Sequence, residues 1–194
     1  MSSMPPSSAE SSGSSASGDA LPAPRELMTL PGMSHDIRRW RLVRIRLGGR
    51  RRNAMLTVWR RPPGGAVWVA HVCWGPESAS PQAWGWFLHN PQALEPLAEP
   101  GESAPVADAV AVAPEVVGPS DPDGADRCWN LAWIRIGGAW RSAVVIERRR
   151  PPAPGLPWAV YARWGEDKDA GWLLADGVAV RPVAEASTAA EVVR

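Results

Sequence analysis

The sequence predicts an all-β protein built from two copies of one small module. Three observations support this fold class. A stretch of about 60 residues recurs later in the chain. Apolar residues within each copy alternate with polar ones at a period of two, which is typical of strands with one buried face. Each copy also contains a Gly-Gly pair where a tight hairpin is expected, because glycine adopts positive φ at little steric cost.

The repeat divides the chain into parts. Residues 40–49 read Trp-Arg-Leu-Val-Arg-Ile-Arg-Leu-Gly-Gly, and residues 129–138 read Trp-Asn-Leu-Ala-Trp-Ile-Arg-Ile-Gly-Gly. Arg-Arg-Pro-Pro and Trp-Gly recur downstream in both copies. The expected parts are a disordered Ser/Pro/Ala-rich tail (1–35), module 1 (36–98), an acidic, extended Pro/Ala-rich linker (99–127), module 2 (128–185) and a C-terminal tail (186–194).

Module 1 is expected to form five strands. The first alternates Val43, Ile45 and Leu47 with arginines and ends at the Gly-Gly turn. A double proline ends the second strand, because proline has no N–H to continue a ladder. The third strand ends at Trp-Gly. The expected strands lie around residues 43–47, 53–60, 68–74, 85–89 and 94–97.

Module 2 is expected to form the equivalent five strands, around residues 132–136, 142–149, 158–164, 171–175 and 180–183. Neither copy contains a sustained helical stripe. Five short antiparallel strands must hide two sheet edges, and a small, strongly bent barrel does so. The chain has 12 Trp but one Phe and one Tyr, and large indoles enlarge a small core.

The tryptophans fall into two groups. Four pairs recur in both copies and are expected in the cores: 40/129, 68/158, 74/164 and 86/172. The unmatched ones are expected at rims or at a contact between the modules, because a core requirement would have been duplicated. They are Trp59, Trp84, Trp133 and Trp140.

The order of strands and turns resembles Tudor-type and Src-homology-3-like small barrels. In module 1 the resemblance rests on Gly48-Gly49, Arg51-Arg52-Asn53-Ala54, Trp74-Gly75 and Leu94-Glu95-Pro96-Leu97. In module 2 it rests on Gly137-Gly138, Trp140-Arg141-Ser142-Ala143, Trp164-Gly165 and Val180-Arg181-Pro182-Val183. The motif is degenerate, so it supports the fold, and function only by analogy.

The resemblance also implies an aromatic groove in module 2. In Tudor-type barrels, one aromatic residue after the first hairpin and another at the end of the third strand help to wall a cage for a cationic group. Trp140 and Trp164 stand at those two positions, and Glu166 and Asp167 follow. Two indoles beside carboxylates would attract a methylated Lys or Arg. The alternative is that both tryptophans cover the end of the barrel.

The charge is distributed unevenly along the chain. The net charge of +1 excludes a uniformly basic nucleic-acid binder and an acidic solvating protein. Residues 38–97 of module 1 nevertheless contain ten Arg against two Glu, whereas the linker is acidic. Arginine binds phosphates with bidentate, permanently charged contacts. The arginines expected to bind nucleic acid are Arg44, Arg46, Arg50, Arg51, Arg52, Arg60 and Arg61. The alternatives are a solvated face, or a surface that the linker neutralises.

No catalytic or metal-binding motif is present. The sequence lacks a Walker loop, a dinucleotide fingerprint, a Gly-x-Ser-x-Gly elbow and a His-Glu-x-x-His motif. His71 and Cys73 share one strand face, but structural zinc needs four ligands. Two cysteines cannot form a disulfide scaffold in a chain of 194 residues. We therefore expect no enzyme, no metal and no cofactor.

The resulting hypothesis is a non-catalytic binding protein whose module 1 contacts nucleic-acid phosphates. The alternatives are an adaptor that binds a protein or peptide partner through module 2, and a structural component whose modules only pack together. No apolar stretch reaches the roughly 18 residues of a spanning helix, and the first 30 residues lack the features of a secretory signal. We therefore expect a cytoplasmic protein, and the Arg, Ala, Gly and Pro bias suggests a bacterial source.

Overall fold

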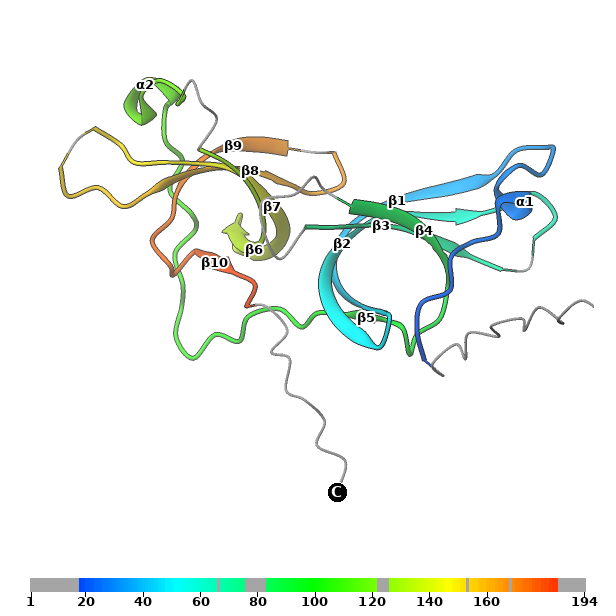
Figure 1. Cartoon of the computed structure of the whole chain (residues 1–194). Coiled ribbons are helices and arrows are strands. Elements are labelled where there is room, and N and C mark those ends of the chain that lie inside the picture. Colours follow the sequence, from blue (N-terminus) through cyan, green and yellow to red (C-terminus); the bar gives the residue numbers. More distant parts are fainter. Residues whose placement is uncertain are drawn as a thin grey trace, which may run out of the picture.

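The computed structural model describes residues 18–65, 67–75, 83–121, 126–152, 154–167 and 169–184. It confirms an all-β protein with two five-stranded antiparallel sheets (Figure 1). Sheet 1 has the order β4-β3-β2-β1-β5 and sheet 2 the order β10-β6-β7-β8-β9. Its strands are β1 (His35–Leu47), β2 (Arg50–Arg61), β3 (Val69–Trp74), β4 (Ala83–Leu88), β5 (Leu94–Pro96), β6 (Arg127–Ile136), β7 (Ala139–Arg149), β8 (Ala159–Trp164), β9 (Asp169–Leu174) and β10 (Val180–Pro182).

The Gly-Gly turns form the tight hairpins that the sequence predicted. Gly48 and Gly49 have φ of 57° and 75°, and they join Leu47 to its strand partner Arg50. The second copy has φ of 61° and 75° at its two glycines. Positive φ at both turn residues matches the twist of a two-residue hairpin. The second strand of each module therefore begins three residues earlier than expected, directly after the turn.

Each module has a core on the inner face of its bent sheet. In module 1, Val43 and Ile45 of β1 pack with Leu56 of β2 and Val72 of β3. In module 2, the repeat-equivalent inner face again supplies the core, which includes Ile134, Ala143, Val145, Val160 and Leu173. The period-two alternation thus predicted the buried face correctly in both copies.

An extended segment precedes each sheet and crosses it. We call residues 19–28 strap 1 and residues 108–117 strap 2; they end in the short helices α1 (Arg25–Met28) and α2 (Pro114–Val117). Strap 1 is held by backbone hydrogen bonds from Ala20 N–H to Arg46 O (2.8 Å), Ala23 N–H to Trp86 O (2.8 Å) and Leu88 N–H to Leu21 O (2.9 Å). Strap 2 makes the equivalent bonds from Ala109 to Arg135 (2.8 Å), Val112 to Trp172 (2.9 Å) and Leu174 to Val110 (3.0 Å).

The straps correct the expected boundaries of tail and linker. Strap 1 belongs to module 1 and strap 2 to module 2, so neither segment is a free tail or a linker. Asp-Ala-Leu at residue 19 recurs as Asp-Ala-Val at residue 108, with the same separation as Trp40 and Trp129. The repeat therefore extends further toward the N-terminus than the strands alone indicated. Residues 1–17 and 185–194, which include about half of the expected N-terminal tail and all of the expected C-terminal tail, lie outside the described residues.

The straps also explain why the sheets are open. The sequence predicted closed barrels, but no ladder joins β4 to β5 or β9 to β10 in the described residues. The edge of β4 is instead bridged by Pro22 opposite Phe87, and the edge of β9 by Ala111 opposite Leu173. Because each strap occupies this edge, the fifth strand cannot pair there.

The described part of the chain contains no helix long and apolar enough to cross a membrane.

The two modules pack against each other through the outer faces of β1–β2 and β6–β7. Leu42 and Met55 of module 1 form one buried cluster with four residues of module 2: Leu131, Trp133, Trp140 and Val144. Leu131 is the repeat equivalent of Leu42, and Val144 that of Met55. The interface is therefore built from the same positions of both copies. The backbone N–H of Leu42 also donates to Ser142 Oγ at 3.0 Å within this interface.

Candidate anion-binding cleft

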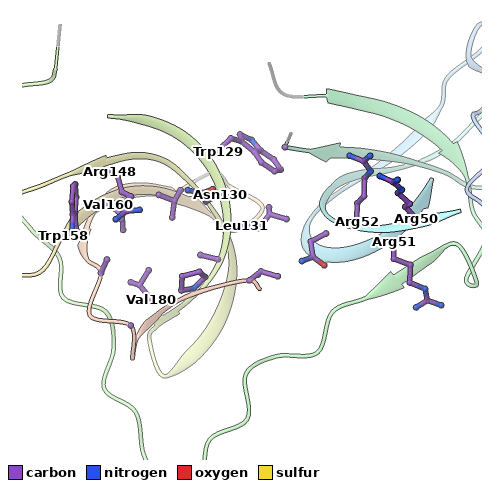
Figure 2. A pocket seen from close by; sticks show the side chains of 18 residues that line it. Arg50, Arg51, Arg52, Trp129, Asn130, Leu131, Arg148, Trp158, Val160 and Val180 are labelled. Atoms are coloured by element: carbon purple, nitrogen blue, oxygen red, sulfur yellow. The ribbon is translucent and has the colours of Figure 1, made fainter. Parts of the chain in front are cut away.

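The arginines of the β1–β2 hairpin lie on both sides of the sheet. Arg44, Arg46 and Arg51 share the outer face, where Arg46 pairs with Asp19 (3.2 Å) and Arg51 with Glu95 (2.7 Å). The alternating register places Arg50 and Arg52 on the opposite side of the hairpin, and Figure 2 shows both pointing away from Arg51. The hairpin thus presents two sets of cations rather than one.

Arg60 and Arg61 stand at the far end of β2. Arg60 lies ten residues further along β2 than Arg50, about 33 Å measured along the curved strand. Its guanidinium donates to both carboxylate oxygens of Asp36 (2.8 and 2.6 Å) and lies 4.6 Å from the ring centre of Trp86. Arg60 lowers the pKa of the Asp36 carboxyl, chiefly through this hydrogen bond. Arg61 donates to Gly65 O at 3.0 Å. The seven predicted arginines therefore do not form one phosphate-binding face.

A cleft of about 680 Å³ lies between the β1–β2 hairpin and module 2 (Figure 2). Arg50, Arg51 and Arg52 line one side and Arg148 of β7 the other. Among the described residues, no Asp or Glu lines the cleft. Glu95, which pairs with Arg51, lies outside it, and both side chains are about half exposed, so this ion pair is weak and exchangeable. The described residues therefore give the lining of the cleft a net positive charge.

Two tryptophans form part of the wall of the cleft. Trp158 is 42% exposed, and the Arg148 guanidinium lies 4.5 Å from its ring centre. Trp129 lies between the two groups of arginines in Figure 2. It packs directly on Gly75, where an added Cβ would come within 2.5 Å of the Trp129 ring. Both tryptophans were expected in the cores because they recur in both copies. Trp158 lies at the cleft instead, whereas Trp129 lines the cleft and also packs against the buried cluster between the modules.

One difference between the two copies is a sequence signal for this cleft. Arg148 occupies the position that Trp59 occupies in module 1. Trp59 packs against the core of module 1 and contacts His89 with ring centres 4.9 Å apart. Exchange of an apolar residue for a cation between two copies indicates a change of environment. Which residues would face Arg148 could not be read from the sequence.

The structure does not bring Trp140 and Trp164 together. Trp140 is 8% exposed within the interface between the modules, and the Arg181 guanidinium lies 4.7 Å from its ring centre. Trp164 stands opposite Ala143 and packs against the core on the inner face of sheet 2. Because Trp140 alternates with Ala143, the two indoles lie on opposite faces of the sheet, and they wall no common groove.

The acidic residues near the expected groove are placed elsewhere. Glu166 pairs with Arg39 of module 1 at 3.0 Å, and Asp167 is exposed. The acidic linker does not neutralise module 1 in the contacts described: Glu102 pairs with Arg135 of module 2 at 2.6 Å. The unmatched Trp133 and Trp140 do lie at the contact between modules, as expected.

The described residues contain no group of three His, Cys, Asp or Glu side chains that could hold a metal ion. Cys73 and Cys128 form no disulfide, and burial raises the pKa of both thiols. Comparison of the chain with protein-family models, with curated proteins and with solved structures gave no match.

Proposed function

We propose that the protein is a non-catalytic binding protein that holds a nucleic-acid strand in the cleft between its modules. The observation that carries this proposal is the charge of the cleft: four arginines line it, and no described carboxylate does. Arginine matches the bidentate geometry of phosphate and remains charged at every physiological pH. Such a cleft favours a polyanion and repels the cationic groups that a Tudor-type cage would bind.

The tryptophans of the cleft favour nucleic acid among polyanions. Trp158 with its stacked Arg148, and Trp129 beside Gly75, present ring surface within reach of the same arginines. Bases stack on such surfaces regardless of sequence, whereas an acidic peptide gains little from them. The fold that we propose for each module, a small Tudor-like or Src-homology-3-like barrel left open at one edge, would supply the rigid support for both walls.

The proposal is tested by binding of fluorescein-labelled 20-mers of DNA and RNA to the full chain, measured by anisotropy. Replacement of both Arg50 and Arg148 by Ala should weaken binding by roughly tenfold or more. It should also reduce the slope of log K against log salt by about one for each phosphate that no longer binds an arginine. Arg163→Ala is the matched control, because Arg163 is exposed on β8 and does not line the cleft.

Two results would overturn the proposal. One is the absence of salt-dependent binding to any 20-mer. The other is an equal loss of affinity in the cleft variant and in the Arg163 control. Competition by polyglutamate at equal charge concentration separates a general polyanion site from a nucleic-acid site: displacement as efficient as that by unlabelled DNA would assign the cleft to acidic peptides.

A further inference from the structure

The outer face of sheet 1 carries a second feature beside the interface with module 2. Four aromatic rings follow one another across it, and we call them the outer strip: Trp129, Trp84, His71 and Trp86. We propose that the outer strip stacks unpaired bases, so that the ligand of the cleft is a single-stranded nucleic acid. This inference rests on the proposed function and names the class of nucleic acid.

The register of β3 and β4 places these rings in a row. Gly75, Cys73 and His71 alternate with the core residues of β3 and so face outward. Trp129 covers Gly75, Trp84 stands opposite Cys73, and Trp86 stands opposite His71. The His71 ring lies between the two indoles, with ring centres 5.5 Å from Trp84 and 4.9 Å from Trp86. Gly75, Cys73 and His71 are two residues apart along β3, and each such step is about 6.6 Å.

The outer strip begins at the cleft, because the two share one residue. Trp129 lines the cleft and also begins the outer strip. Arg50 and Arg52 point to the other side of the hairpin, so a strand whose phosphates contact them would pass over Trp129, at the end of β3, to reach Trp84. At the other end, Arg60 lies against Trp86, but its guanidinium already donates to both carboxylate oxygens of Asp36. Net positive charge therefore stands at the cleft end of the row of rings.

The fold itself does not require the outer strip. Module 2 has the same strands, yet Ala170 stands at the position of Trp84, Tyr161 at that of His71 and Arg163 at that of Cys73. Trp84 is 64% exposed, more than any other tryptophan described. Trp84 lies beside His71 and Trp86, so its exposed indole is part of a contiguous aromatic patch, and such patches mark interaction sites where a single exposed residue does not. Module 2 keeps the ring pair Tyr161 and Trp172, with the Arg149 guanidinium 4.7 Å from the Trp172 ring centre. The exposed indole of Trp84 is the part that module 1 adds.

Stacking on the outer strip would distinguish single strands from duplexes. In a duplex the faces of the bases are covered by their neighbours and their edges are paired. A single strand exposes base faces that stack on indole and imidazole rings with little regard to sequence. The arginines of the cleft bind phosphates of either form. The outer strip therefore predicts a preference that the cleft alone would not produce.

The test compares Trp84→Ala with the unaltered full chain on a dT20 single strand and on a 20-base-pair duplex. The variant should bind the single strand roughly 5- to 100-fold more weakly and the duplex unchanged, since it removes one ring on which a base stacks. Trp84→Phe should retain most of the affinity. Leu30→Ala, another exposed apolar position outside the cleft and the outer strip, should change neither affinity. Because the Trp84 side chain is exposed, its removal leaves both cores intact.

The outcomes separate this inference from the proposed function. If binding depends on Arg50 and Arg148 but is unaffected by Trp84→Ala, the outer strip has no role in binding, and the proposed function of the cleft still holds. Equal losses on single strand and duplex would overturn the single-strand preference. If the unaltered chain binds neither ligand, the proposed function fails and this inference fails with it.

Discussion

The carboxylate of Asp19 accepts hydrogen bonds from the backbone N–H of Gly49, at 2.9 and 3.1 Å, across thirty residues of chain. Asp108 accepts from Gly138 in the same way, at 3.0 and 3.2 Å. Each strap thus begins by capping the tight turn of its own module. Asp19 also pairs with Arg46, whose carbonyl receives the first hydrogen bond of strap 1. Strap 1, which belongs to the expected N-terminal tail, is thereby part of the fold.

Asp19→Ala should lower the free energy of unfolding by about 1–3 kcal/mol, because it removes a charge-assisted hydrogen bond and leaves the Arg46 guanidinium without its partner. Urea unfolding followed by tryptophan fluorescence measures the change. Asp167→Ala, at an exposed carboxylate, serves as control. If the two variants were equally stable, Asp19 would be a surface residue with no role in holding strap 1.

Met55→Ala should destabilise the whole molecule and not one module. Met55 is fully buried in the cluster between the modules, and truncation of such a residue costs about 2–5 kcal/mol. Val144→Ala, at the equivalent position of module 2, should act in the same direction with a smaller effect. Calorimetry should show one transition that shifts as a unit. Two separated transitions, only one of which moves, would contradict joint unfolding.

Gly75→Ala should lower stability by about 1–3 kcal/mol, because the new Cβ would meet the Trp129 ring at 2.5 Å. The same change at Gly101, where nothing lies within 4 Å, is the matched control. Trp129→Ala should cost less in the Gly75→Ala background than in the unaltered chain. If the double-mutant cycle shows no coupling energy between the two positions, Gly75 and Trp129 are not in contact.

His71 should make stability depend on pH. Burial, and secondarily the nearby Arg60, lower the pKa of His71 below its usual 6.5, while Thr57 Oγ1 lies 2.7 Å from its Nδ1 atom. Between the folded pKa and 6.5 the unfolded chain binds more protons. The contribution of neutral His71 to the free energy of unfolding is therefore complete above pH 6.5, and it is lost as the pH falls from 6.5 toward the pKa of His71 in the folded chain. The free energies of unfolding at pH 7.5 and 5.5 should differ less in His71→Gln than in the unaltered chain. Equal differences in the two proteins would show that His71 is not a source of the pH dependence.

Local sequence patterns were sufficient for the strands and hairpins. Val43, Ile45 and Leu47 alternate with arginines, and this period specifies an extended chain with one buried side. Gly48-Gly49 specifies a two-residue hairpin, because few other residues tolerate positive φ at both positions. Both signals depend on neighbouring residues alone, and the repeat doubled them. The ten strands could therefore be located from the sequence, although β1 begins at His35 and not near residue 43, and β6 begins at Arg127 and not near residue 132.

The straps escaped prediction for a physical reason. Their contribution is made through backbone N–H and C=O groups, as in the bond from Ala20 to Arg46, and small residues such as Ala and Pro carry no apolar period. The same composition is typical of disordered tails. The recurrence of Asp-Ala at residues 19 and 108 is a sequence signal for the straps. It was not recognised, because residue 19 lies in the expected tail and residue 108 in the expected linker.

The sequence by itself determined the fold class, the duplication and the inner faces, since each depends on residues near one another in the chain. The tertiary structure alone decided what the outer faces meet. Leu42 and Met55 pack on module 2, whereas His71 and Trp84 on the same face of sheet 1 are left uncovered by it. A period of two assigns side chains to two faces but does not say which face another module covers. The cleft that joins Arg50 to Arg148 arises only from that docking, because its walls come from strands of different modules.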